Sequence, residues 1–180
     1  MNLPNKLTVA RLVAVPVIMV CMALEAPWAA WAVFALFVLA CITDFLDGQI
    51  ARKRNLVTDL GKFLDPLADK VLVCTVLTYF VSFAYAHPAA VIIVLFREFV
   101  VSGIRMNAAD KGRVVAANIY GKIKTLFQMV SLSAVLFFRA LTPGAEWLSL
   151  VSNVCVWIIA AITAVSGVTY VIQNRDVIKE

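Results

Sequence analysis

The chain has 180 residues, of which 63% are hydrophobic and only 15% charged, and its formal net charge is +5. An ordinary soluble domain is about half apolar and about a quarter charged, so this composition excludes a soluble monomer and a disordered chain. We expect one domain, residues 1–180, whose main solvent is the lipid bilayer. No nucleic-acid partner is expected.

Six apolar segments follow one another along the chain, and a helix needs about 20 apolar residues to cross a bilayer. They cover residues 7–24, 28–47, 67–84, 89–101, 123–138 and 147–171. Pro16 is expected to interrupt the first segment. Arg97 and Glu98 lie near the end of the fourth, which spans only if these charges face a protein interior or the interface. The sequence thus predicts an all-α, polytopic integral membrane protein with six transmembrane helices.

The distribution of charge predicts the orientation of these helices. Arg139 is the only basic residue beside the short connections between the first and second, third and fourth, and fifth and sixth segments. All other basic residues, and most acidic ones, fall on the side of the two termini. The positive-inside rule then places both termini and the longer charged loops in the cytoplasm.

A set of aspartates joins the second predicted helix to the third. The first group has the spacing i, i+3, i+4, i+7 of one helix face: Asp44, Asp47, Gly48 and Ala51. The second has the spacing i, i+4, i+8: Gly61, Asp65 and Asp69. Pro66 is expected to kink or start this third helix. Two antiparallel helices would bring four carboxylates together, where two divalent cations with oxygen ligands would neutralise them.

Small residues and one arginine accompany these acids. Gly48, Ala51 and Gly61 let helices pack closely or let a ligand approach the backbone, and Arg52 can meet a phosphate. Bound metals, an arginine and small residues on the same helix faces together indicate a substrate that carries a diphosphate. For any single aspartate, a solvated helix end or a lysine neighbour is the alternative interpretation.

Residues 44–69 match the pattern D-x2-D-G-x2-A-R-x8-G-x3-D-x3-D at every defined position. This is the signature of the CDP-alcohol phosphatidyltransferases, which the chain resembles over its whole length. Residues 3–11 look like the N-terminal segment of that family. Residues 97–105 and 121–125 look like the subgroup that makes phosphatidylglycerol phosphate. The resemblance implies transfer of a phosphatidyl group from CDP-diacylglycerol to sn-glycerol 3-phosphate, with release of CMP.

The same resemblance implies roles for individual residues. Two metal ions, Mg²⁺ or Mn²⁺, would be held by Asp44, Asp47, Asp65 and Asp69. Asp69 would also act as the base on the acceptor hydroxyl. The CDP site would be lined by Thr8, Gly48, Ala51, Arg52 and Gly61. Family members are often homodimers. Compact members usually lie in the bacterial inner (cytoplasmic) membrane, with the active site facing the cytoplasm.

A second basic set lies at the cytoplasmic ends of the fourth and fifth predicted helices: Arg97, Arg105, Lys122 and Lys124. We interpret it as the site for the phosphate of the acceptor. The alternatives are anchoring to anionic lipid headgroups and, for Arg97, a simple internal pair with Glu98. Lys122 and Lys124 are two residues apart, so one helix face cannot hold both.

Other functions stay open at this point. A sibling enzyme could use inositol phosphate, serine or a phospholipid as acceptor, because the signature alone does not separate these. A small divalent-cation transporter would spread its acids through the depth of the bilayer, whereas here they stay near one face. A non-enzymatic scaffold gives no reason for four aspartates at fixed spacing with interleaved glycines.

Overall fold

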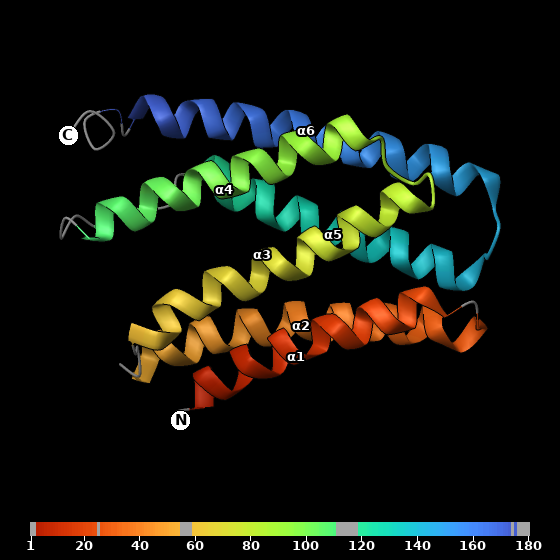
Figure 1. The fold of residues 1–180 in the computed structure, drawn as a ribbon, viewed down its shortest axis with the longest axis horizontal. Coiled ribbons are helices and arrows are strands. Elements are labelled where there is room, and N and C mark those ends of the chain that lie inside the picture. Colours follow the sequence, from red (N-terminus) through yellow and green to blue (C-terminus); the bar gives the residue numbers. More distant parts are fainter. Residues whose placement is uncertain (1–2, 25, 55–58, 111–118, 174, 176–180) are drawn as a thin grey trace. The chain divides into compact units, whose positions relative to one another are not determined.

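The computed structural model forms six helices and no strand among the residues that it describes (Figure 1). These residues are 3–24, 26–54, 59–110, 119–173 and 175, with side chains described except at 3–5, 47–54, 59–66, 109–110 and 119–120. The helices are α1 (Leu3–Ala23), α2 (Pro27–Arg54), α3 (Asp59–Ser82), α4 (Pro88–Asp110), α5 (Ile119–Leu141) and α6 (Glu146–Gln173). The all-α prediction is confirmed.

Two proline expectations are corrected by the helix bounds. Pro16 lies inside α1, which runs on without interruption. Prolines are tolerated in apolar helices when neighbouring groups satisfy the backbone carbonyl that loses its donor. Pro66 also lies inside a helix, because α3 begins at Asp59. Of the two expectations for Pro66, the one that it starts α3 is therefore wrong, and the kink stays a prediction.

Four helices contain segments long and apolar enough to cross a bilayer: Lys6–Ala23, Pro27–Leu46, Gly121–Leu141 and Glu146–Gln173. The described parts of α3 and α4 do not meet this criterion, because charged residues interrupt their apolar character. Large apolar side chains are exposed on all six helices, from Val13 on α1 to Ile172 on α6. A lipid environment accounts for this exposure, since a soluble protein of this size would bury more of them.

The chain forms two compact units, and each is described on its own. Unit one consists of Met1–Tyr79 and Leu132–Ala145. In it α1 and α2 lie side by side (Figure 1). The buried face of α1 recurs every three or four residues: Thr8, Arg11, Val15, Ile18 and Met22. That of α2 does the same: Ala29, Val33, Phe37 and Ala40. This spacing is the 3.6-residue period of helix packing.

Unit two consists of Phe80–Ser131 and Glu146–Glu180, and in it α4 and α6 lie side by side (Figure 1). α4 begins at Pro88, a position where the missing proline N–H has no intrahelical partner to lose. His87 Nδ1 accepts a hydrogen bond from Ala89 N at 3.2 Å and so caps this end. The buried face of α6 changes from mainly apolar to small and polar toward its end, where it carries Thr163, Ser166 and Gly167.

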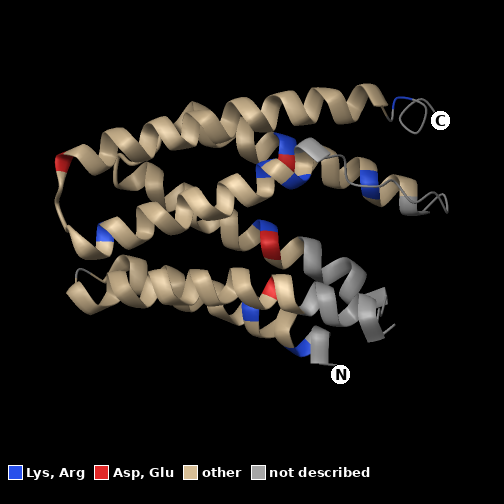
Figure 2. Cartoon of the chain, turned by 180° about the vertical axis from the view of Figure 1, so that it is seen from behind, with Lys and Arg blue, Asp and Glu red and all other residues tan. Residues whose placement is uncertain are grey.

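Charged residues gather toward one end of the helices in each unit (Figure 2). In unit one, the described charges of α1, α2 and α3 lie nearer the N-terminal end of α1. In unit two, most charges of α4 and α5 lie nearer the C-terminal end of α6. Each gathering contains residues predicted from the sequence to take part in a site.

Candidate active site

Arg11 joins two of the predicted metal ligands in unit one. Its Nη1 donates a hydrogen bond to Asp69 Oδ1 at 2.9 Å and lies 2.9 Å from Asp44 Oδ1. The Arg11 side chain is only 1% exposed, whereas the two carboxylates are 28% and 33% exposed. Because both carboxylate oxygens contact the same nitrogen, the distance between them is at most the sum of these two contacts. We call these three residues, which come from α1, α2 and α3, the Arg11 cluster.

The local sequence explains why these side chains meet. Arg11 lies on the buried face of α1, one turn after the fully buried Thr8. Asp44 lies one turn after the buried Ala40 on α2, and Asp69 follows the buried Ala68 on α3. An arginine in such a place is costly to bury unless carboxylates neutralise it, so the three side chains stabilise one another.

Only part of the predicted metal and CDP site falls within the described side chains. The side chains outside them are those of Asp47, Gly48, Ala51, Arg52, Gly61 and Asp65. Among the side chains that are described, no group of three or more His, Cys, Asp or Glu could hold a metal ion. The structure brings Asp44 and Asp69 together and buries Thr8 nearby on α1, and the four-aspartate site stays a prediction.

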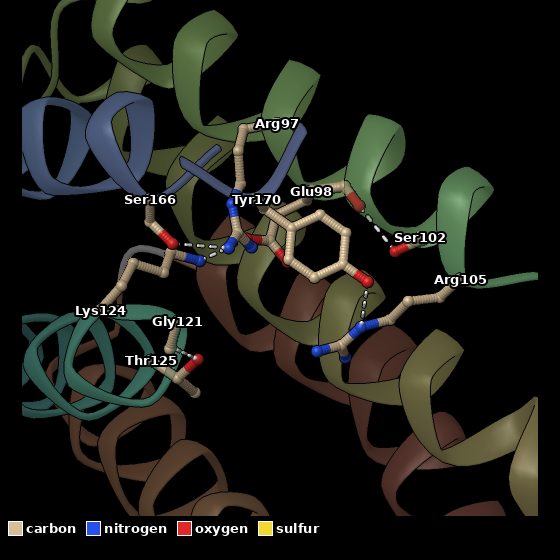
Figure 3. Close-up of polar contacts among 9 residues, drawn as sticks. All are labelled: Arg97, Glu98, Ser102, Arg105, Gly121, Lys124, Thr125, Ser166 and Tyr170. Atoms are coloured by element: carbon tan, nitrogen blue, oxygen red, sulfur yellow. Dashed lines mark hydrogen bonds and ion pairs between the residues drawn. The ribbon is translucent and has the colours of Figure 1, made fainter. Parts of the chain in front are cut away.

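A second charged cluster lies in unit two, where α4, α5 and α6 contribute to it (Figure 3). Arg97 Nη1 lies 3.2 Å from Glu98 Oε1, and Arg97 Nη2 donates a hydrogen bond to Ser166 Oγ at 2.9 Å. Lys124 Nζ donates to the same Glu98 Oε1. The Arg97, Glu98 and Lys124 side chains are 13%, 16% and 4% exposed. We call these three residues and Ser166 the Arg97 cluster.

Arg105 lies beside this cluster and is held by Tyr170 of α6 (Figure 3). Arg105 Nε donates to the Tyr170 hydroxyl at 3.4 Å, and its guanidinium carbon lies 5.6 Å from the Tyr170 ring centroid. This is the geometry of a cation–π contact. Two of the four predicted acceptor-binding residues, Arg97 and Lys124, thus meet at Glu98, and a third, Arg105, is held by Tyr170 of α6. Lys124 is buried whereas Lys122 is exposed, in agreement with the expectation that one helix face cannot hold both.

The electrostatics of unit two suit an anionic ligand. Arg97, Arg105 and Lys124 bring three positive charges, and Glu98 brings one negative charge, which leaves an excess of two positive charges among these residues. The Nε of Arg97 is buried and has no hydrogen-bond partner within the described part of the chain. A buried donor without a partner is costly, so an oxygen ligand at this point would stabilise the cluster.

Sequence reasoning missed two contributions that the geometry makes plain. Arg11 was read only as part of the N-terminal segment, although a single basic residue inside an apolar helix is itself a signal of a buried partner. From the sequence, Glu98 is only a neighbour of Arg97. In the structure its Oε1 also accepts a hydrogen bond from Lys124 Nζ.

Comparison with known proteins decides the family. The family model described as CDP-alcohol phosphatidyltransferase matches residues 1–172. The chain belongs to the CDP-alcohol phosphatidyltransferase family. The resemblance read from residues 44–69 is therefore confirmed, and the chain is a transferase of phospholipid biosynthesis.

Curated members of this family resemble the chain over nearly its whole length. A CDP-diacylglycerol–glycerol-3-phosphate 3-phosphatidyltransferase from Bacillus subtilis (strain 168) is 41% identical, over 99% of this chain and 97% of its own length. A protein of the same name from Rickettsia bellii (strain RML369-C) is 42% identical, over 94% of this chain and 93% of its own. A cardiolipin synthase (CMP-forming) from Oryza sativa subsp. japonica is 35% identical, over 89% of this chain and 53% of its own.

Proposed function

We propose that this chain transfers the phosphatidyl group of CDP-diacylglycerol to sn-glycerol 3-phosphate, giving phosphatidylglycerol phosphate and CMP. The observation that carries the proposal is the similarity, over nearly the full length, to relatives named for this reaction. The oxygen of the acceptor hydroxyl forms a bond to the phosphatidyl phosphorus, and the bond from this phosphorus to the oxygen of the leaving CMP breaks. The proton of the hydroxyl passes to Asp69.

The Arg11 cluster serves the donor side of this reaction. Asp44, Asp47, Asp65 and Asp69 would hold two divalent ions, Mg²⁺ or Mn²⁺. When bound, such ions neutralise the diphosphate and stabilise the leaving CMP. The fit rests on the donor atoms, because carboxylate oxygens are the ligands that hard cations prefer. It is supported by the contact of Asp44 and Asp69 with the same nitrogen of Arg11, because these contacts bring the two carboxylates close together.

Asp69 acts on the acceptor hydroxyl in this proposal. An alcohol in water holds its proton more tightly than a carboxylic acid, so Asp69 assists as the proton leaves in the transition state. Arg11 supports this role by holding Oδ1 of Asp69 at 2.9 Å, which fixes the direction of the carboxylate. Thr8, Gly48, Ala51, Arg52 and Gly61 line the CDP site in this proposal.

The Arg97 cluster holds the phosphate of the acceptor. A phosphate monoester carries up to about two negative charges at neutral pH. This matches the excess of two positive charges that the Arg97 cluster and Arg105 have together. Anchoring to lipid headgroups requires cations that reach the membrane surface. Lys124 and Arg97 are too deeply buried for that, at 4% and 13% exposure. Arg105 and Lys122 are exposed and are compatible with either role.

The same proposal includes the setting of the enzyme. We place it as a six-span protein of the bacterial inner membrane, with both termini and the active site on the cytoplasmic side, and as a homodimer. The four apolar spans and the one-sided basic residues support this orientation. The lipid tails of the donor require a site that opens sideways to the bilayer.

An acceptor panel tests the proposal. The purified protein in detergent receives CDP-diacylglycerol, Mg²⁺ or Mn²⁺ and one of four acceptors: glycerol 3-phosphate, inositol phosphate, serine or phosphatidylglycerol. We expect CMP release with glycerol 3-phosphate and only background release with the others and with added EDTA. Release with inositol phosphate but not glycerol 3-phosphate would overturn the acceptor assignment, and release with none of them would overturn the enzyme assignment.

A further inference from the structure

Gly167 of α6 gives Arg97 the space in which it lies. A Cβ atom added at Gly167 would be 2.8 Å from Cγ and 3.7 Å from Cβ of Arg97, and the first of these distances is shorter than real Cβ contacts allow. The aliphatic stem of Arg97 therefore lies directly against the backbone of α6. Gly121 of α5 is less critical, since its added Cβ would be in ordinary contact, 3.7 Å from Arg97 Nη2.

The residues on either side of Gly167 on the buried face hold the arginines by their polar groups. Ser166, fully buried, accepts the hydrogen bond from Arg97 Nη2. Tyr170 lies one turn further and is 2% exposed. Its hydroxyl accepts a hydrogen bond from Arg105, and its ring makes the cation–π contact with the Arg105 guanidinium (Figure 3). Earlier polar residues of this face differ, because the hydroxyls of Ser152 and Thr163 have no hydrogen-bond partner within the described part of the chain.

We propose that Ser166, Gly167 and Tyr170 are positioning residues that hold Arg97 and Arg105 of α4 in the geometry that receives the acceptor phosphate. The inference rests on the proposed function, in which these arginines bind that phosphate. An arginine in solution samples many rotamers, and ordering it on binding weakens affinity. α6 orders the arginines in advance, so its last turns set the affinity for the phosphorylated acceptor although none of the three residues carries charge.

Paired alanine variants test this inference. Gly167→Ala is compared with Gly103→Ala on α4, where an added Cβ meets nothing within 4 Å. Ser166→Ala is compared with Ser152→Ala, which removes a hydroxyl from the same buried face without breaking a described hydrogen bond. We expect Gly167→Ala to raise KM for glycerol 3-phosphate at least about tenfold and Ser166→Ala about fivefold. KM for CDP-diacylglycerol should stay within about twofold, as should both constants in the two control variants.

Inhibition by inorganic phosphate gives a readout that a merely structural role would not move. Phosphate competing with glycerol 3-phosphate should inhibit Gly167→Ala and Ser166→Ala more weakly, in proportion to their rise in KM. Tyr170→Phe keeps the ring and loses the hydroxyl, so its rise in KM should be smaller than that of Tyr170→Ala.

Arg97→Ala separates the failure of this inference from failure of the proposed function. If Arg97→Ala leaves KM for glycerol 3-phosphate unchanged, the assignment of the Arg97 cluster to the acceptor phosphate is wrong. If Arg97→Ala raises that KM while Ser166→Ala behaves like Ser152→Ala, only the positioning role of α6 is overturned. Ser166→Ala decides the matter even if Gly167→Ala fails to fold, because it only removes one oxygen atom.

Discussion

Replacing Asp69 by asparagine should lower the turnover number for CMP release by about a thousandfold, while the protein still folds. Asparagine keeps the shape of the side chain and an oxygen that can accept the hydrogen bond from Arg11, but it cannot take the proton of the acceptor hydroxyl. The measurement is CMP release at saturating CDP-diacylglycerol and glycerol 3-phosphate, with thermal unfolding of the detergent-solubilised protein as the check on folding.

A matched control for this variant is Glu146→Gln, which makes the same acid-to-amide change at the exposed start of α6. Its turnover should remain within about twofold of the unmodified protein, as expected for a surface change. Turnover of Asp69→Asn within tenfold of the unmodified protein would remove the assignment of Asp69 as the base.

Replacing Lys124 by methionine should raise KM for glycerol 3-phosphate about a hundredfold and leave KM for CDP-diacylglycerol nearly unchanged. Methionine fills much of the volume of the lysine stem but removes the charge that meets Glu98 Oε1. Glu98 is then neutralised by Arg97 alone, so the cluster attracts a phosphate less strongly. Steady-state kinetics with each substrate varied in turn measure the two constants.

The same substitution at Lys122 compares the contributions of Lys122 and Lys124 to acceptor binding, a role that is predicted from the sequence for both. Lys122 is exposed and Lys124 is 4% exposed, so Lys122→Met should raise KM far less than Lys124→Met. An equal rise in both variants would show that general positive charge at the membrane surface, and not the buried cluster, attracts the acceptor.

The helices could be predicted from the sequence because lipid-facing segments are apolar on all sides. Their ends could not, since a helix does not stop where hydrophobicity stops. The fourth segment was expected to end at residue 101, yet α4 continues to Asp110 and buries Ala108 on the way. Arg105, Met106, Ala108 and Ala109 have good helix propensity, which favours continuation of the helix beyond the apolar segment.

The candidate site could be predicted where charge and spacing carry the information. The meeting of Asp44 with Asp69 agrees with positions chosen from helix periodicity. The burial of Lys124 beside the exposed Lys122 agrees with the expectation that one helix face cannot hold both. Arg11 was missed because a basic residue near the N-terminus also fits simple membrane anchoring. The last turns of α6 were missed because Ser166 and Gly167 are ordinary residues in an apolar helix, and only packing against Arg97 reveals what they contact.

The most direct test of the whole account is the fate of isotope-labelled glycerol 3-phosphate. The purified protein would be incubated with CDP-diacylglycerol, Mg²⁺ and glycerol 3-phosphate labelled with ¹³C, and the lipid products would be analysed by mass spectrometry. We predict a labelled lipid with the mass of phosphatidylglycerol phosphate, formed in equal amount to the CMP released. CMP release with no label in the lipid would mean that water is the acceptor, and it would contradict the assignment of the chain as a glycerol-3-phosphate transferase.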